Sequence, residues 1–180
     1  NEDGSMARLP DLIKFAQLHG LKIGTVADLI QHRRRTETIV QRETTAPFNS
    51  IHGGDFTLHL YTNKIDHVEH VALVKGNLTA GGEPPLVRMH ALNVLEDVLG
   101  DRSHSHGGEL QDAMRMIAEA GRGVIVLLRE AQPASLSQKL AAQQGVAPGK
   151  ELRDYGVGAQ ILLDLGVQDM VLLSNSKKNI

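Results

Sequence analysis

The chain has 180 residues, of which 41% are hydrophobic, 3% are aromatic and none is cysteine, and its formal net charge is −2. This composition supports a packed aliphatic core and excludes a wholly disordered chain, a disulfide framework, a thiolate metal site and a strongly basic nucleic-acid surface. The sequence has no apolar run of membrane-spanning length and no signal-peptide pattern, so we expect a cytoplasmic protein with neither nucleic acid nor membrane as a partner.

The first 35 residues have the pattern of a small α/β fragment. Apolar spacing after Pro10 predicts a helix that ends at Gly20. Residues 21–24 predict a short strand. Thr25 then begins a second helix, with Asp28 in the capping-box position three residues later.

From residue 36 onward the apolar residues alternate with a period of two, which indicates β-strands. Strands are expected at 38–42, 56–61, 68–74 and 86–90, separated by Pro47, Gly53 with Gly54, Asn63, and Gly81 with Gly82. Helices are then expected at 110–120, 136–144 and 155–165, with strands at 123–128 and 170–173. This order predicts a mixed α/β fold, in which a partly closed antiparallel sheet is followed by α/β units, and a boundary between a segment at 1–35 and a domain at 36–180.

Residues 1–10, with the sequence NEDGSMARLP, resemble the terminal motif of 3,4-dihydroxy-2-butanone-4-phosphate synthase. Residues 19–30, HGLKIGTVADLI, continue the resemblance through that enzyme's last helix. The resemblance implies that 1–35 are the carboxy-terminal remnant of such a domain, whose acidic metal and substrate ligands mostly lie upstream. We therefore expect a piece of a longer polypeptide, as the start at Asn1 also suggests, and no synthase activity from this piece alone.

Residues 36–180 resemble GTP cyclohydrolase II through short motifs that occur in the same order. These motifs are HVALVKG at 70–76, PLVRMH at 85–90, IAEAGRGV at 117–124, RDY at 153–155, LGV at 165–167 and LLSN at 172–175. Each motif alone is weakly specific, but their colinear order is strongly specific. The resemblance implies a GTP cyclohydrolase II-like domain that is truncated at its carboxy-terminus.

The resemblance implies the reaction of that family, which is the hydrolytic loss of C8 of GTP as formate with release of pyrophosphate. Zinc held by three cysteine thiolates activates the attacking water, and magnesium assists at the phosphates. Here the three cysteine positions are Asn93, His104 and His106, with the spacing of eleven and then two residues kept. The two histidines could chelate a divalent ion together with His90 or Asp97, or they could belong to a polar loop that leads into a helix. Because two imidazoles and an amide fall short of a usual catalytic set, we expect no tight metal site and no cofactor.

The family's nucleotide signature, RQEGRxIGL, is also changed in this chain, where residues 129–136 read REAQPASL. Only Arg129 survives, while Ala131 and Pro133 replace a glutamate that reads the guanine edge and an arginine for phosphate. Four matched positions persist and could keep a weak anion pocket. Arg153 matches the nucleophile toward the phosphate, and Glu151 lies at the position of a catalytic aspartate. Arg88 matches an arginine in the first motif and Lys178 roughly matches a phosphate-contacting lysine, so with Arg129 they are expected to bind nucleotide or phosphate. The alternative is that Arg153 braces the start of a helix by pairing with Glu151 or Asp154.

We predict a riboflavin-biosynthesis segment whose cyclohydrolase-like domain lacks zinc-dependent GTP hydrolysis and serves the assembly or regulation of the upstream synthase domain, as a homodimer. Two alternatives stay open: an active GTP cyclohydrolase II with a histidine-based metal site, and a binding module for another phosphorylated ligand. The expected partners are the synthase domain of the same polypeptide and GTP or another phosphorylated small molecule. Six other histidines are expected to be surface or half-buried residues and not ligands, namely His19, His32, His52, His59, His67 and His70.

Overall fold

A computed structural model of the chain describes residues 4–29, 32, 37–103, 107–129, 136–137, 140–141 and 155–175. The chain divides into two compact units, Asn1–Glu37 and Thr38–Ile180.

The first unit contains the helix α1, Leu9–Leu18, which is followed by Gly20 in a left-handed conformation (φ 62°). The predicted capping box is confirmed, because the Thr25 backbone N–H donates to Asp28 Oδ2 at 3.1 Å and the Asp28 backbone N–H donates to Thr25 Oγ1 at 3.0 Å. The strand predicted at 21–24 is wrong, since these residues have no regular structure. Within the described part of this unit there is no second strand with which the segment could pair.

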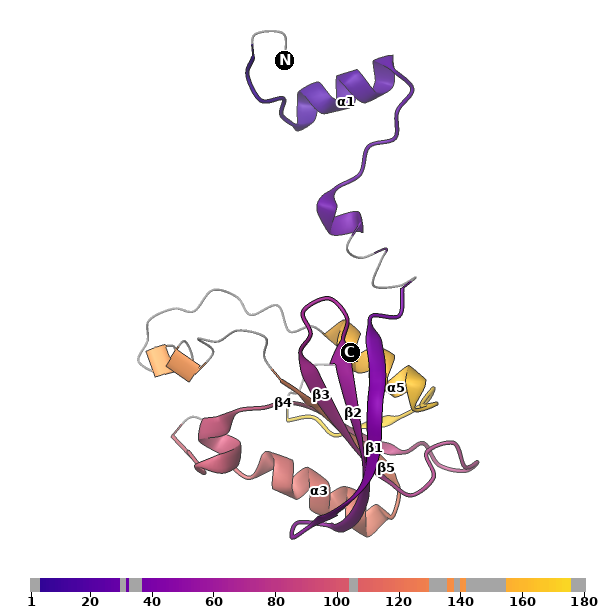
Figure 1. Ribbon diagram of the computed structural model, residues 1–180, viewed down its shortest axis with the longest axis vertical. Helices are drawn as coiled ribbons and strands as arrows, with labels where there is room; N and C mark the ends of the chain where they lie inside the picture. Colours follow the sequence, from indigo (N-terminus) through magenta and orange to yellow (C-terminus); the bar gives the residue numbers. More distant parts are fainter. Residues whose placement is uncertain are drawn as a thin grey trace. The chain divides into compact units, whose positions relative to one another are not determined.

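The second unit is built on a six-stranded sheet with the strand order β1-β2-β3-β5-β4-β6 (Figure 1). The strands are β1 Val40–Ser50, β2 Gly54–Asn63, β3 Glu69–Lys75, β4 Leu86–Ala91, β5 Gly123–Leu128 and β6 Val171–Leu172. The neighbouring pairs β1–β2, β2–β3 and β3–β5 are antiparallel, whereas β4 is parallel to both β5 and β6. The mixed α/β fold is confirmed, and the antiparallel strands and the α/β units share one sheet.

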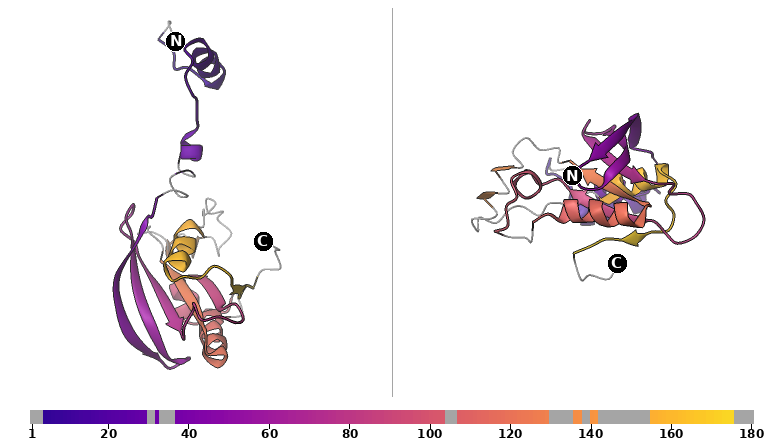
Figure 2. Two further views of the ribbon diagram at one scale, coloured as in Figure 1. Left: turned by 90° about the vertical axis from the view of Figure 1, so that its right-hand side faces the viewer. Right: turned by 90° about the horizontal axis from the view of Figure 1, so that it is seen from below.

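Two helices cover opposite faces of this sheet: α3, Glu109–Ala120, and α5, Tyr155–Asp164 (Figures 1 and 2). The side chains of the central strand β5 alternate between two hydrophobic cores, one on each face of the sheet. Val124 and Val126 pack in the core that contains Ile161 of α5, and Ile125 packs in the core that contains Ile117 of α3. Burial on both faces explains why β5 reads as a continuous apolar run.

The strand β1 is longer than predicted, since it runs through Pro47, which the sequence had suggested as a strand boundary. Pro47 pairs with Thr57 of β2, and β1 is one of the two edge strands of the described sheet. At an edge, a residue without an N–H can face outward and leave the ladder intact. The local signal for a break was therefore overridden by the position of the strand in the sheet.

Two histidines expected at the surface or half-buried are in fact buried, His59 at 8% exposure and His70 at 5%. His70 pairs with Tyr61 of the neighbouring strand, and His59 lies two residues before Tyr61 on β2. The period of two therefore places both imidazoles on the face that carries the fully buried Tyr61.

Candidate functional site

The candidate site lies where the three parallel strands end. Because β5, β4 and β6 are parallel, their carboxyl ends meet at one edge of the sheet, the usual position of sites in α/β proteins. Asn93 follows β4, Arg129 follows β5 and Asn175 follows β6. A backbone hydrogen bond of 2.9 Å from Leu92 to Leu128 holds the first two of these ends together.

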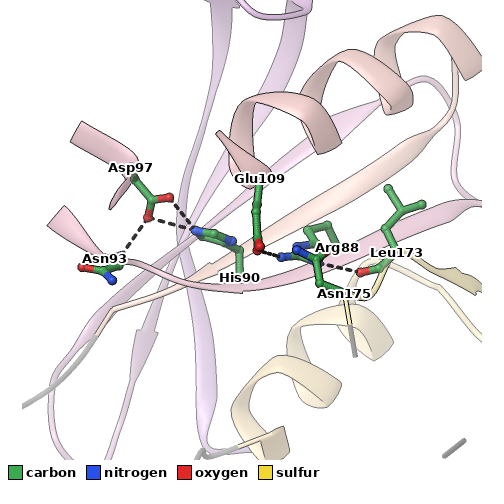
Figure 3. Close-up of polar contacts among 7 residues, drawn as sticks. All are labelled: Arg88, His90, Asn93, Asp97, Glu109, Leu173 and Asn175. Carbon is green, nitrogen blue, oxygen red and sulfur yellow. Dashed lines mark hydrogen bonds and ion pairs between the residues drawn. The ribbon is translucent and has the colours of Figure 1, made fainter. Parts of the chain in front are cut away.

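His90 and Asp97 form a buried pair at this edge (Figure 3). His90 Nε2 lies 2.9 Å from each carboxylate oxygen of Asp97, and the Asp97 side chain is 5% exposed. The same carboxylate accepts a hydrogen bond from the Asn93 backbone N–H at 2.8 Å, and the Asp97 carbonyl accepts one from Gln111 Nε2 at 3.0 Å. Asp97 therefore ties together β4, the short π-helical turn η1 (Val94–Val98) and α3.

Asn93, which the resemblance assigns to the position of the family's first zinc cysteine, serves as the cap of η1. Its Oδ1 accepts a hydrogen bond from the Leu95 backbone N–H at 3.2 Å. His104 and His106, the other two predicted metal residues, lie outside the described residues. In the part of the chain that the structure describes, no group of three or more His, Cys, Asp or Glu side chains is placed to hold a metal ion. The described donors do not fit the family's zinc, because the amide oxygen caps a turn and His90 is bonded to Asp97.

Arg88, predicted to contact phosphate, is held inside the domain (Figure 3). It lies on β4 between two neighbouring strands, and its side chain is 10% exposed. Arg88 Nη2 donates to Glu109 Oε2 at 2.8 Å, and Nη1 donates to the Leu173 carbonyl at 3.1 Å and to Asn175 Oδ1 at 3.3 Å. The guanidinium is thus engaged by three residues from two parts of the fold, the start of α3 and the segment that follows β6.

Arg129, predicted to be the remaining residue of the family's nucleotide signature, is placed differently. Its backbone N–H donates to the buried His70 Nδ1 at 3.2 Å, while its guanidinium is 52% exposed and lies 3.4 Å from Glu69 Oε2. Since Nδ1 accepts this hydrogen bond, His70 fixes the end of β5. The remaining predicted residues, Glu151, Arg153 and Lys178, lie outside the described residues.

A second polar cluster, which the sequence did not suggest, joins β1, β2 and α5. Tyr61 donates from its hydroxyl to Asp164 Oδ2 at 2.7 Å, and Arg42 Nε lies 2.9 Å from the same oxygen. Burial raises the pKa of Tyr61 well above its usual range, and the hydrogen bond to Asp164 raises it further. For Asp164, burial alone would raise the pKa, but hydrogen bonds from Tyr61 and Arg42 hold it below the ordinary value. These contacts fasten the end of α5 to the sheet.

The family model of GTP cyclohydrolase II matches residues 41–180. The chain belongs to the GTP cyclohydrolase II family. Among relatives, it is 42% identical over 196 residues to the riboflavin biosynthesis protein RibBA of Bacillus subtilis, a match that covers 100% of this chain and 48% of that protein. It is also 42% identical over 185 residues to the monofunctional riboflavin biosynthesis protein RIBA 2, chloroplastic, of Arabidopsis thaliana, which covers 98% of this chain and 38% of that protein.

Among solved structures, the chain matches RibBX from A. baumannii, described as a two-domain 3,4-dihydroxy-2-butanone 4-phosphate synthase. The match has a TM-score of 0.62 and 36% identity, and covers 99% of this chain and 47% of that one. The chain spans about half the length of the curated relatives it matches first. These matches include residues before 41, so they confirm the resemblance of both parts of this family member to riboflavin-biosynthesis proteins. No helix among the described residues is long and apolar enough to cross a membrane.

Proposed function

We propose that the chain is the carboxy-terminal part of a riboflavin-biosynthesis protein in which the cyclohydrolase-like domain no longer hydrolyses GTP. In this proposal the domain serves the assembly or regulation of a 3,4-dihydroxy-2-butanone-4-phosphate synthase domain that precedes it in the same polypeptide, with residues 1–35 as the end of that domain.

The proposal rests on the side chain of Asn93, which offers no thiolate and is already hydrogen-bonded within η1. The family's reaction needs a Lewis acid that makes hydroxide available at neutral pH, and thiolates supply the ligands for it. The chain has no cysteine, and Asn93 offers a neutral amide whose oxygen already caps η1. His90, the described imidazole nearest along the chain, is bonded to Asp97. These residues support a domain that keeps the fold without the zinc chemistry.

The nucleotide contacts support the same proposal independently. Ala131 and Pro133 stand where the family carries a glutamate and an arginine toward GTP. Arg88 is engaged by Glu109, Leu173 and Asn175 instead of facing solvent. Loss of the metal and loss of the nucleotide contacts remove different contributions to transition-state stabilisation, so retaining one would not compensate for the other.

The match to RibBX is consistent with this division of roles. That protein has two domains and is named only as a 3,4-dihydroxy-2-butanone 4-phosphate synthase, and this chain aligns with 47% of it. A domain of this kind can therefore accompany a synthase domain in a protein that is named for the synthase activity alone.

One alternative has an observation in its favour. His104 and His106 keep the spacing of the last two zinc cysteines, which would suit an active enzyme with a histidine-based metal centre. That alternative requires a tightly bound ion and GTP turnover in the same preparation, and the present proposal requires neither.

The test is metal quantification together with formate release from GTP on one preparation, with and without added zinc. The proposal expects far less than one zinc ion per chain and no formate above the blank. A matched variant with Asn93→Cys, His104→Cys and His106→Cys restores the thiolates and should gain zinc but still release no formate, because Ala131 and Pro133 remain. Stoichiometric metal together with GTP turnover in the unmodified chain would refute the proposal.

A further inference from the structure

The surroundings of Arg88 have the features of an anion site. Its side chain is nine-tenths buried, and its Nε is buried without a hydrogen-bond partner among the described residues. The guanidinium points toward α3 from β4 (Figure 3). A buried guanidinium requires a negative partner, because an uncompensated charge at low exposure is strongly destabilising.

The partner that satisfies this requirement is Glu109, the first residue of α3. Glu109 Oε2 lies 2.8 Å from Arg88 Nη2, and the preceding residue, Gly108, is the N-cap of the twelve-residue helix. The carboxylate therefore sits both on a guanidinium and at the positive end of a helix. Phosphate groups are commonly bound by this combination, since the helix dipole and charge-assisted hydrogen bonds favour the same anion.

We propose that Glu109 is a built-in anion that occupies the position formed by Arg88 and the N-terminus of α3, and that it excludes phosphate groups from it. The inference rests on the proposed function and deepens it, since it names a residue that prevents nucleotide binding. GTP and other ligands that carry a phosphate or pyrophosphate group are excluded by the negative charge of Glu109, in addition to the loss of the family's nucleotide contacts.

Two physical effects make the exclusion strong. Glu109 is covalently tethered next to Arg88, so a free phosphate competes with a partner that is always present. A phosphate that approached without displacing Glu109 would meet a like charge and would find Arg88 Nη1 already bonded to the Leu173 carbonyl and Asn175 Oδ1.

The substitution Glu109→Gln removes the charge and keeps the shape and an acceptor oxygen. The described hydrogen-bond partners of Arg88 are then all neutral, and its positive charge becomes available to an external anion. The matched control is Asp112→Asn, which makes the same charge change in the same helical turn, where Asp112 pairs with the exposed Arg115.

The experiment measures the melting temperature of the full chain and of both variants with inorganic pyrophosphate and, separately, with GTP. At a pyrophosphate concentration about 100 times the Kd, Glu109→Gln should melt roughly 5 °C or more above its ligand-free value. The unmodified chain and Asp112→Asn should not shift. Equal stabilisation of the unmodified chain, or no stabilisation of a folded Glu109→Gln variant, would overturn the inference.

A second measurement covers the case in which Glu109→Gln does not fold. The side-chain N–H resonances of Arg88 in the unmodified chain should be unchanged by millimolar pyrophosphate, and a saturable shift of those resonances would contradict the inference. Both readouts concern binding and involve neither zinc nor turnover. A failure here is therefore distinguishable from a failure of the proposed function, which would appear as bound metal and formate.

Discussion

The hydroxyl of Tyr61 donates to Asp164 Oδ2 at 2.7 Å, although the two residues are 103 positions apart in the chain. Tyr61 lies on β2 and is fully buried, while Asp164 is the last residue of α5. Arg42 completes the contact by donating from Nε to both partners, at 3.1 Å to Tyr61 and 2.9 Å to Asp164. The end of α5 is therefore fixed to the antiparallel part of the sheet, from which the chain returns to β6.

Replacement Tyr61→Phe should lower the free energy of unfolding by about 1–2 kcal/mol, because it removes one hydroxyl from a buried network and leaves the aromatic packing intact. Urea denaturation measures this loss. In an Asp164→Asn background the same replacement should cost less, since the charged acceptor is already gone. Strict additivity of the two single changes would show that the hydroxyl and the carboxylate are not coupled.

Asp97→Asn should lower the free energy of unfolding by about 3 kcal/mol, which is more than the loss expected for Tyr61→Phe. The Asp97 side chain is 5% exposed, and its carboxylate accepts hydrogen bonds from both His90 and the Asn93 backbone. Chemical denaturation of the full chain gives the comparison. The neighbouring Glu96→Gln provides the control, as the Glu96 side chain makes no hydrogen bond or ion pair among the described residues. A loss for Asp97→Asn no larger than that for Glu96→Gln would mean that the pair does not hold this turn.

His59 should make stability depend on pH. Burial lowers the pKa of His59, and the nearby positive charge of Arg42 lowers it further. Near this pKa the folded chain binds fewer protons than the unfolded chain. The free energy of unfolding is therefore undiminished by His59 above the unfolded-state pKa of about 6.5 and falls as the pH drops through it. Unfolding measured between about pH 7.5 and pH 5.5 should show a smaller loss of stability in His59→Gln than in the unmodified chain. Identical pH slopes would refute this assignment.

Gly76→Ala should destabilise the domain by about 2–4 kcal/mol, because Gly76 has a φ of 66° and a Cβ there would meet the carbonyl oxygen of Gly121. The control is Gly81→Ala, where a Cβ would meet nothing within 4 Å, and its expected change is within about 0.5 kcal/mol. Thermal unfolding of both variants provides the measurement. A tolerated Gly76→Ala would mean that the turn after β3 can move away from Gly121.

Local patterns were sufficient for most of the secondary structure. The capping box at Thr25 and Asp28 depends on residues three positions apart, and the apolar run of β5 requires only that both faces of the strand be covered. Where an assignment depended on a distant strand, the sequence misled. The segment 21–24 has strand-like residues without a partner strand in the described part of its unit, and Pro47 lies in a strand whose edge position tolerates it.

The candidate site shows the same limit. Motif order identified Arg88 and Asn93 as positions of interest, but not the side chains that engage them. Glu109 follows Arg88 by 21 residues and reaches it only because the crossover from β4 to β5 returns the start of α3 to the end of β4. The contact between Tyr61 and Asp164 requires the full path of the chain, so no local pattern predicts it.

Pro47 and the shift in register after Arg42 have a consequence for association between molecules. An edge strand with a missing donor and an irregular ladder is a poor template for an incoming strand, and β6, at the opposite border, has only two residues. Both borders of the described sheet are therefore poorly suited to extension by a further strand. Self-association of this domain should use side-chain surfaces, and the chain should resist strand-by-strand aggregation while it folds.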